Sequence, residues 1–328
     1  MNRFNHLLEK MSASIKPEID KFQEYYLDSM LTDVKLINSV VRYIAKRKGK
    51  QFRPRLCILS AKICGEVNEN TYKAASLVEM IHVATLIHDD VVDDSNLRRG
   101  WPSVNRIWKN KVSILVGDYL FSTALSKMYD IDDRDALKVL SDTAKRLSQG
   151  EIMQVESAIK KNLSEEDYLK MIKDKTSSLI SASTLLGAIS STHEKSKRDA
   201  LYKFGEKLGT MFQIKDDLID ITGLDREVGK PTMFDLKKNI LTLPIIHIIS
   251  QQTKSDKKSF ISNLKYLSKK NNKKEIKKLI IDLGGIEYSE QKISEISNSA
   301  IKDLSCFSDS DTKSALILAI NFNMKRRY

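Results

Sequence analysis

The chain has 328 residues, of which 41% are hydrophobic and 7% aromatic, and its formal net charge at pH 7 is +12. It contains only 12 Gly and 5 Pro, no linker rich in Pro, Gly or Ser divides it, and its apolar residues recur at helical spacing. This composition excludes a β-rich fold, so we expect one all-α domain over residues 1–328.

The first residues and the three cysteines bear on where the protein is located. Residues 1–6 resemble neither a signal peptide nor a transit peptide. Cys57 and Cys64, seven positions apart, are expected on one buried helix face as small apolar residues. Together with Cys306 they form neither a CxxC pair nor a cluster with histidine, which argues against zinc or redox chemistry. We therefore expect a cytoplasmic protein.

A short basic turn precedes the first long helix. Between Lys48 and Pro54, a Gly suited to chain reversal and a Pro suited to a helix start would hold Lys50 and Arg53 on one side. Two cations in this arrangement suit a phosphate group. An ordinary surface turn explains the same residues, so this motif alone does not indicate a phosphate site. It does so only together with the acidic and basic motifs that follow.

An aspartate cluster, Asp89-Asp90-Val91-Val92-Asp93, follows the apolar residues 80–87. Positions i and i+4 lie about 5.4 Å apart on one helix face, so Asp89 and Asp93 point to the same spot. Two carboxylates about 6 Å apart repel by about 3 kcal/mol at an effective dielectric constant near 20. A hard divalent ion such as Mg²⁺ relieves this repulsion best. For a single cluster, a solvated acidic helix face is the alternative.

Several charged residues surround this first cluster. His82 lies on the same face as Asp89, where it is either a satisfied core histidine or a hydrogen-bond donor to an anion. Arg98 and Arg99 precede a Gly and a Pro that are expected to end the helix near the carboxylates. The later acidic run at residues 132–135 is expected only to cap the next helix.

A second cluster of the same form, Asp216-Asp217-Leu218-Ile219-Asp220, also emerges from apolar helical residues. Asp216 and Asp220 are four positions apart, so they too are expected to point to one spot. If the two helices face each other, the carboxylates line one cavity. Lys175-Thr176 and Gly229-Lys230-Pro231 add two more candidate cations. Acidic clusters accompanied by short basic segments favour a site for Mg²⁺ and a polyphosphate over two unrelated solvated faces.

Much of the excess positive charge lies in residues 254–278, which are rich in Lys and poor in aromatic residues. Solvated helix faces and loops explain this segment better than a nucleic-acid surface does, so no nucleic-acid partner is expected. The longest apolar stretch, residues 240–249, contains Pro244 and is too short to span a bilayer.

From about Lys48 to Pro244, these segments resemble the trans-type (E) polyprenyl diphosphate synthases, in particular the long-chain octaprenyl, heptaprenyl and solanesyl members. Residues 81–94 look like the first aspartate-rich motif of that family, and residues 209–220 look like its second. The resemblance implies the isoprenoid synthase fold: an all-α bundle of about ten or more helices around a deep central cavity. It also implies a homodimer, with weak peripheral membrane contact as one route for product release.

The resemblance implies that the chain condenses isopentenyl diphosphate with an allylic diphosphate, using several Mg²⁺ ions per site. The metal ligands would be Asp89, Asp93 and Asp216, supported by Asp90, Asp217, Asp220 and Asp235. The allylic diphosphate would be held by Arg98, Lys175 and Lys230, and isopentenyl diphosphate by Lys50, Arg53, His82 and Arg99. Thr176 and Gln213 would face the developing carbocation. The basic residues 324–328 resemble family C termini that fold over the cavity, although a solvated tail fits them equally well.

Two segments depart from the common family pattern. Lys48 and Gln51 replace a Gly and an Arg of the usual basic turn, although the spacing from Lys50 to Arg53 is kept. Ile240 stands where many short-chain members carry a Lys, which resembles some long-chain members instead.

Product length is expected to depend on side chains along the first aspartate helix. Short-chain members carry an aromatic residue four or five positions before the first Asp, whereas this chain has Thr85 and Ala84. One helical turn of about 5.4 Å admits roughly one more prenyl unit, so the next obstacles are Ile81, Met80 and Leu77. We predict a long product, on the scale of a quinone side-chain precursor.

Three other functions remain as alternatives. A short-chain farnesyl or geranylgeranyl synthase would share every motif except the small residues beside the first cluster. A class I terpene cyclase would need only one diphosphate, and so would not need Lys50, Arg53 and Arg99. A non-catalytic helical scaffold would be expected to lack one of the aspartate clusters.

Overall fold

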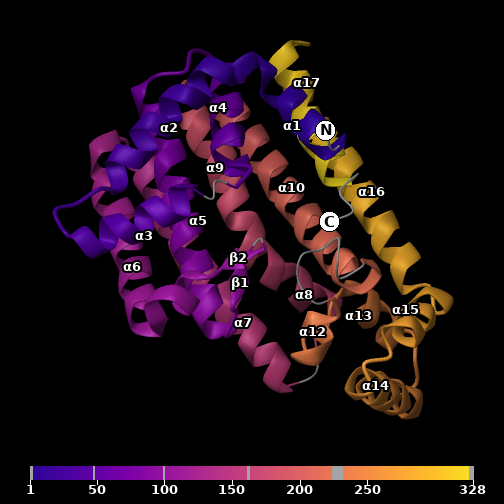
Figure 1. Ribbon diagram of the computed structural model, residues 1–328. Coiled ribbons are helices and arrows are strands. Elements are labelled where there is room, and N and C mark those ends of the chain that lie inside the picture. The colour runs from indigo at the N-terminus through magenta and orange to yellow at the C-terminus, as the bar shows by residue number, and fades with distance from the viewer. Residues whose placement is uncertain (1–2, 47–48, 99, 161–162, 224–231, 325–328) are drawn as a thin grey trace.

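The computed structural model describes residues 3–46, 49–98, 100–160, 163–223 and 232–324, and nearly all of them are helical (Figure 1). In chain order the elements are α1 (Arg3–Ser12), η1 (Ala13–Ile15), α2 (Lys16–Met30), α3 (Lys35–Lys46), α4 (Phe52–Cys64), α5 (Glu69–Val92), β1 (Leu97–Arg98), β2 (Trp101–Pro102), α6 (Val104–Met128), η2 (Tyr129–Ile131), α7 (Arg134–Lys160), α8 (Glu165–Ile172), η3 (Lys173–Ser177), α9 (Ser178–Ile189), α10 (Lys195–Thr222), α12 (Phe234–Lys237), α13 (Leu243–Ser250), α14 (Lys254–Lys269), α15 (Lys273–Asp282), α16 (Gly285–Asp303), η4 (Leu304–Cys306) and α17 (Asp311–Met324). The predicted all-α fold is confirmed.

Helix α5, which carries the first aspartate cluster, lies at the centre of the bundle. It packs against α2, α4, α6 and α9, so most of its side chains are buried and it lacks the one-sided apolar stripe of a surface helix. A reciprocal cap fixes its start: the Asn68 side chain accepts the Thr71 backbone N–H, and the Thr71 hydroxyl accepts the Asn68 N–H, both at 3.2 Å. The cluster therefore lies at the far end of a rigid, buried helix.

The first described helix, α1, lies alongside the last, α17 (Figure 1). The Lys-rich residues 254–278 form α14 and part of α15, which extend from the edge of the bundle in Figure 1. Phe260, Leu264 and Ile276 anchor these two helices to a second, smaller apolar core. Six of their ten lysines are exposed, which agrees with the interpretation of solvated helix faces, whereas Lys273 and Lys277 are partly buried and donate to the Thr232 hydroxyl and the Thr222 carbonyl.

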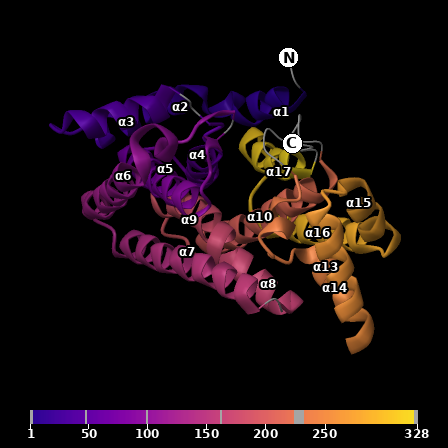
Figure 2. The same cartoon turned by 60° about the horizontal axis from the view of Figure 1, so that its bottom comes forward.

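Helix α7 lies across one side of the bundle and packs against both α8 and α9 (Figure 2). The only described β structure is a two-residue antiparallel pair between β1 and β2, with Gly100 at a φ of +77° in the turn. None of the described helices is both long enough and apolar enough to cross a bilayer.

Candidate active site

The two aspartate clusters lie near the C-terminal ends of α5 and α10, and the structure divides their carboxylates into two groups. Asp90, Asp217 and Asp220 are buried, with 2%, 4% and 6% of their surface exposed. The remaining three, Asp89, Asp93 and Asp216, are partly exposed. In the first cluster this division follows the helical period, because Asp89 and Asp93 share one face while Asp90 turns inward. In the second cluster the same expectation is wrong: Asp216 and Asp220 are also four positions apart, but Asp220 is buried because the backbone at the start of α12 covers it.

Asp90 forms an ion pair with Arg98. The Arg98 guanidinium, presented by β1, donates from Nε to both Asp90 carboxylate oxygens at 2.8 and 2.9 Å, and its Nη2 lies 2.7 Å from Oδ1. The Asn105 side chain donates to the Asp90 backbone carbonyl at 3.2 Å. Arg98 does lie at the carboxylates, as predicted from the sequence, but its charge is largely directed at Asp90.

Two charged side chains from other elements, Glu151 of α7 and Lys175 of η3, act on Asp89. Lys175 donates to Glu151 on α7 at 2.9 Å. Burial raises the pKa of Asp89 to about 7, with a further increase from Glu151 and a partial decrease from Lys175. Burial alone would lower the pKa of Lys175, but Glu151 and Asp89 raise it above its usual value. Lys175 therefore remains a cation beside the first cluster.

A tight approach between α7 and the π-helical turn η3 brings Lys175 to this place. A Cβ atom on Gly150 would lie 2.3 Å from the Lys175 backbone nitrogen, so only glycine fits there. The wider π-helical turn then places Lys175 and Thr176 on the side facing the aspartates. Glu151 was not predicted from the sequence, because nothing near it in the chain distinguishes it from any other surface glutamate.

A chain of hydrogen bonds connects the same turn to the second cluster. The Thr176 hydroxyl donates to Gln213 Oε1 at 2.7 Å, and Gln213 Nε2 donates to Asp217 Oδ1 at 2.8 Å. The buried Tyr168 hydroxyl donates to Asp217 Oδ2 at 2.7 Å. Burial and the nearby Asp235 raise the pKa of Asp217 to about 7, although both hydrogen bonds act against this increase. Tyr168 was also missed, since it lies far from Asp217 in sequence.

Helix α12 forms a second connection between the clusters. Asp220 accepts the backbone N–H groups of Phe234 and Asp235 at 3.1 and 3.3 Å, which fixes the start of α12. Just after α12, Lys238 Nζ donates to Asp93 Oδ1 at 2.5 Å. Ile240 stands where many short-chain family members carry a lysine. In this chain Lys238, two positions earlier, contacts the first cluster instead.

The basic turn and the C-terminal helix meet on another side of the site. Arg53 Nη1 lies 3.0 Å from His82 Nε2, so two residues predicted to bind one substrate are in contact. Lys50 Nζ lies 5.7 Å from the ring centre of Phe322 on α17. In this turn the residue with a left-handed backbone is Gln51, with a φ of +45°.

The candidate chain-length residues differ in accessibility. Thr85 is partly exposed, whereas Ala84, Ile81 and Met80 are completely buried and Leu77 is 1% exposed. Of these five candidates, only Thr85, one turn before Asp89, is more than 1% exposed. The depth of the central cavity remains a prediction. Arg99, Lys230 and residues 325–328, which were predicted to contact substrate or close the cavity, lie outside the described residues.

The described part of the chain holds no group of three or more His, Cys, Asp or Glu side chains close enough to form a complete metal cage. Mg²⁺ keeps several waters and needs only one or two carboxylates when phosphate oxygens complete its shell. The donor set is all carboxylate oxygen, and the pKa of Asp89 is raised mainly by burial and further by the nearby Glu151. These residues therefore fit a hard divalent cation.

The raised pKa of Asp89 leads to a prediction about stability. The folded protein holds the proton on Asp89 up to about pH 7, whereas the unfolded chain releases it near pH 4. Without divalent metal, the contribution of this group to the free energy of unfolding therefore falls as the pH rises from about 4 to about 7. Asp89→Asn is expected to raise Tm relative to the parent at pH 8, with a smaller difference at pH 5. Calorimetry in a chelating buffer would test this, and parallel pH profiles would contradict it.

The polyprenyl synthetase family model matches residues 34–283. The chain is 31% identical to an all-trans-nonaprenyl-diphosphate synthase from Rhodobacter capsulatus over 93% of this chain and 94% of that protein. It is 29% identical to the octaprenyl diphosphate synthase of Escherichia coli over 94% and 96%. Its fold is similar to a polyprenyl synthase structure from Caulobacter crescentus, with a TM-score of 0.90, 29% identity and 98% coverage of both chains.

Proposed function

The chain belongs to the polyprenyl synthetase family, and we propose that, as one catalytic unit, it condenses isopentenyl diphosphate with an allylic diphosphate to make a long all-trans polyprenyl diphosphate. The observation that carries this proposal is the pair of clusters, because Asp89, Asp93 and Asp216 stay accessible while the other three carboxylates are buried. The nonaprenyl and octaprenyl products named for two similar proteins favour a long chain over a short one.

Mg²⁺ is the metal that we propose for this site, held by Asp89, Asp93 and Asp216. Asp90, Asp217 and Asp220 would then position these ligands, since each is buried and already bonded to protein groups. The similar Caulobacter crescentus structure was solved with calcium and isoprenyl diphosphate, which supports an oxygen-ligated divalent ion beside a diphosphate. When bound, such an ion would stabilise the negative charge that develops on the departing diphosphate.

The basic side chains of the site would bind two different diphosphate substrates. Lys175, beside Asp89, would hold the allylic diphosphate together with Lys230, while Arg98 orients Asp90 at the same side. Arg53 and His82, in contact at 3.0 Å, would hold isopentenyl diphosphate with Lys50 and Arg99. These groups come from different elements, η3 on one side and α4 with α5 on the other, which supports a reaction with two diphosphate substrates, whereas a cyclase needs only one.

The reaction itself requires no protein nucleophile. The allylic C–O bond breaks and its electron pair leaves with diphosphate, whose charge Lys175 stabilises. The double bond of isopentenyl diphosphate then attacks the allylic cation, and one proton is lost to the departed diphosphate, which restores an allylic diphosphate one unit longer. Gln213 and Thr176 offer oxygen atoms toward the cation, and the bonds of Gln213 to Thr176 and Asp217 hold its amide in place.

Product length provides a direct test of the long-chain assignment. Ala84→Phe and Thr85→Phe are each expected to shorten the main product by several units, because a ring there blocks the first turn below Asp89. Ala84→Ser, which keeps a small side chain, is the control and should leave the product unchanged. Chromatography of the dephosphorylated products measures the length. Parent-length products from both Phe variants would remove this argument.

A homodimer is the assembly that we propose. Large apolar side chains are exposed on one face of α7, with Ile152, Val155 and Ile159 at 66%, 51% and 73%. Ile114 and Leu115 on α6 are also exposed, and such surfaces are typical of association sites. We also propose a cytoplasmic location, in keeping with the free thiols of the three cysteines, and weak peripheral membrane contact during product release.

Incubation of the purified chain with isopentenyl diphosphate, an allylic diphosphate and Mg²⁺ tests the proposal. Elongation to a long product is expected, and it should stop when a chelator removes the metal. Short products only would favour the short-chain alternative, and cyclic hydrocarbons would favour a terpene cyclase. No elongation from any primer of five to twenty carbons would contradict the proposed function and leave the helical scaffold as the alternative.

A further inference from the structure

The guanidinium group of Arg146, on α7, joins three elements beside the candidate active site. On η3, its Nε donates to Asp174 Oδ1 at 2.7 Å and its Nη2 donates to the Lys173 carbonyl at 3.3 Å. On α10, it donates to the Tyr202 hydroxyl at 3.1 Å and to Glu206 Oε1 at 3.3 Å. The Arg146 and Asp174 side chains are only 24% and 15% exposed, so water and salt screen this ion pair less than they would on an open surface.

The π-helical turn η3 is packed closely between α7 and α10. On one side, Gly150 of α7 leaves room for the Lys175 backbone. On the other side, a Cβ atom on Gly209 of α10 would lie 2.5 Å from the Ser177 Cα, and the Ser177 hydroxyl lies 3.0 Å from that of Thr210. The turn is therefore held between the same two helices that Arg146 connects.

The direction of the Lys175 side chain depends on the π-helical form of this turn. A π-helical turn is wider than an α-helical one and is rare, which indicates that it needs support from surrounding contacts. If the turn relaxed to an α-helix, the side chains on one side of it would rotate by about 100°, the angle of one residue. Lys175 would then move away from Glu151 and Asp89. Asp174 directly precedes Lys175, so Arg146 acts next to the residue whose direction matters most.

We propose that Arg146 is a positioning residue for the condensation: it holds η3 in its π-helical form and so keeps Lys175 beside Asp89. This inference rests on the proposed function, in which Lys175 stabilises the departing allylic diphosphate. In this role Arg146 acts through Asp174 rather than on a substrate. Among its described contacts there is none to α4 or α5, which carry the groups proposed for isopentenyl diphosphate, so only the allylic side of the reaction depends on it.

Arg146→Gln tests the inference. The variant is expected to lower kcat/KM for the allylic diphosphate about 10- to 100-fold, as a small displacement of a catalytic group does, and to leave KM for isopentenyl diphosphate within about twofold of the parent. Asp174→Asn is expected to cause a similar loss. Because the two residues act through one contact, the double variant should lose little more than either single variant. Losses that multiply in the double variant would overturn the inference.

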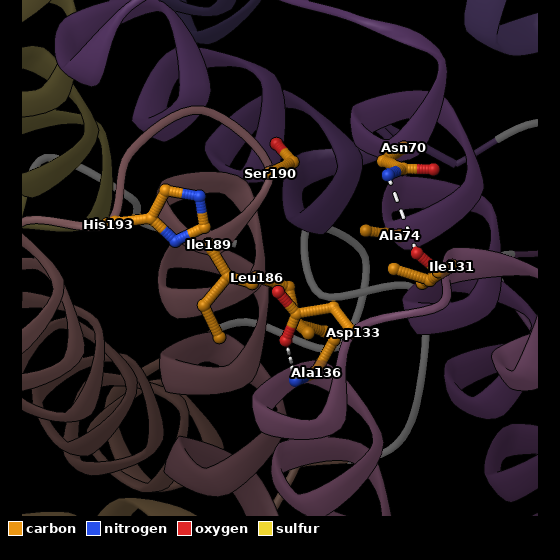
Figure 3. A pocket seen from close by; sticks show the side chains of 9 residues that line it. All are labelled: Asn70, Ala74, Ile131, Asp133, Ala136, Leu186, Ile189, Ser190 and His193. Carbon is orange, nitrogen blue, oxygen red and sulfur yellow. Dashed lines mark hydrogen bonds between the residues drawn. The ribbon is translucent and has the colours of Figure 1, made fainter.

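Arg198→Gln is the matched control. Arg198 of α10 donates to Asp135 of α7 at 2.9 Å, so it joins the same two helices, about 16 Å closer to the start of α7 than Arg146 is. There Asp133 Oδ1 accepts the Ala136 backbone N–H at 3.0 Å, beside a small surface pocket (Figure 3). Among the described contacts of Arg198, none involves η3.

The melting temperature of Arg198→Gln is expected to fall, whereas its kcat/KM for the allylic diphosphate stays within about twofold of the parent. Equal kinetic losses in Arg198→Gln and Arg146→Gln would overturn the inference, because they would show that any bond between α7 and α10 has this effect. If Arg146→Gln fails to fold, Arg146→Lys, which keeps the charge but not the planar fork, should show the same loss to a smaller degree.

Guanidinium ion gives a readout that a loss of stability would not move. In Arg146→Ala, guanidinium chloride at concentrations too low to unfold the protein is expected to restore kcat/KM for the allylic diphosphate several-fold, because the ion fits between Asp174 and Glu206. Sodium chloride at the same concentration should restore nothing. Hydrogen exchange of residues 173–178 should be faster in Arg146→Ala than in the parent and should slow again with guanidinium.

Parent kinetics in a folded Arg146 variant, or unchanged exchange at residues 173–178, would overturn the inference and leave the condensation activity intact. A parent chain with no condensation at all would instead contradict the proposed function. Exchange at the turn would then still decide whether Arg146 holds it.

Discussion

Replacing Asp89 or Asp216 by asparagine is expected to lower the rate of condensation at least about 1,000-fold. Asparagine keeps the size of the side chain but removes the charge that a divalent ion requires. Both positions are partly exposed, and they lie on different helices, so each variant removes one side of the proposed metal site. Initial rates at saturating Mg²⁺ measure the effect.

Asp132→Asn is the control for this pair of variants. Asp132 is exposed and belongs to the acidic run before α7, where Asp133 rather than Asp132 caps the helix. Its replacement should leave the rate within about twofold of the parent, as expected for a surface charge. Retention of more than a tenth of the parent rate by Asp89→Asn would contradict the metal assignment at α5, and the same result for Asp216→Asn would contradict it at α10.

The sequence was sufficient to predict the helices and the two acidic clusters, because both depend on local pattern. Spacing of i and i+4 placed Asp89 with Asp93, and the structure leaves these two partly exposed while Asp90 turns inward. The same spacing paired Asp216 with Asp220 wrongly, because the start of α12, distant in sequence, buries Asp220. The distinction between Asp133 as a cap and the paired clusters also followed from the flanking residues, and the observed hydrogen bonds of Asp133 agree with it.

Contacts between distant segments could not be predicted in this way. Glu151 meets Lys175 because Gly150 lets α7 approach a π-helical turn, and helical periodicity gives no sign of such a turn. Lys238 reaches Asp93 from a segment 145 positions later. The pairing of Arg98 with Asp90 likewise depends on the hairpin geometry. Each of these partners changes the charge around the clusters, so the electrostatics of the site required the structure.

Lys175→Gln is expected to reduce kcat/KM for the allylic substrate about 100-fold or more. The loss has two causes: the allylic diphosphate loses a cation in the transition state, and Glu151 is left without the lysine that balances its charge beside Asp89. The second cause should also raise the pKa of Asp89 further. Mg²⁺ binding in this variant is therefore expected to weaken more steeply than in the parent as the pH falls below about 7.

Lys173→Gln provides the matched control, because it removes the same charge from the same π-helical turn. The Lys173 side chain is 45% exposed and lies 3.9 Å from Glu206, away from the aspartates. We expect this variant to keep nearly the parent kcat/KM and the parent dependence of Mg²⁺ binding on pH. Steady-state kinetics with each substrate varied in turn distinguishes the two lysines. Equal losses in both variants would mean that general charge on the turn, rather than the position of Lys175 between Glu151 and Asp89, supports the reaction.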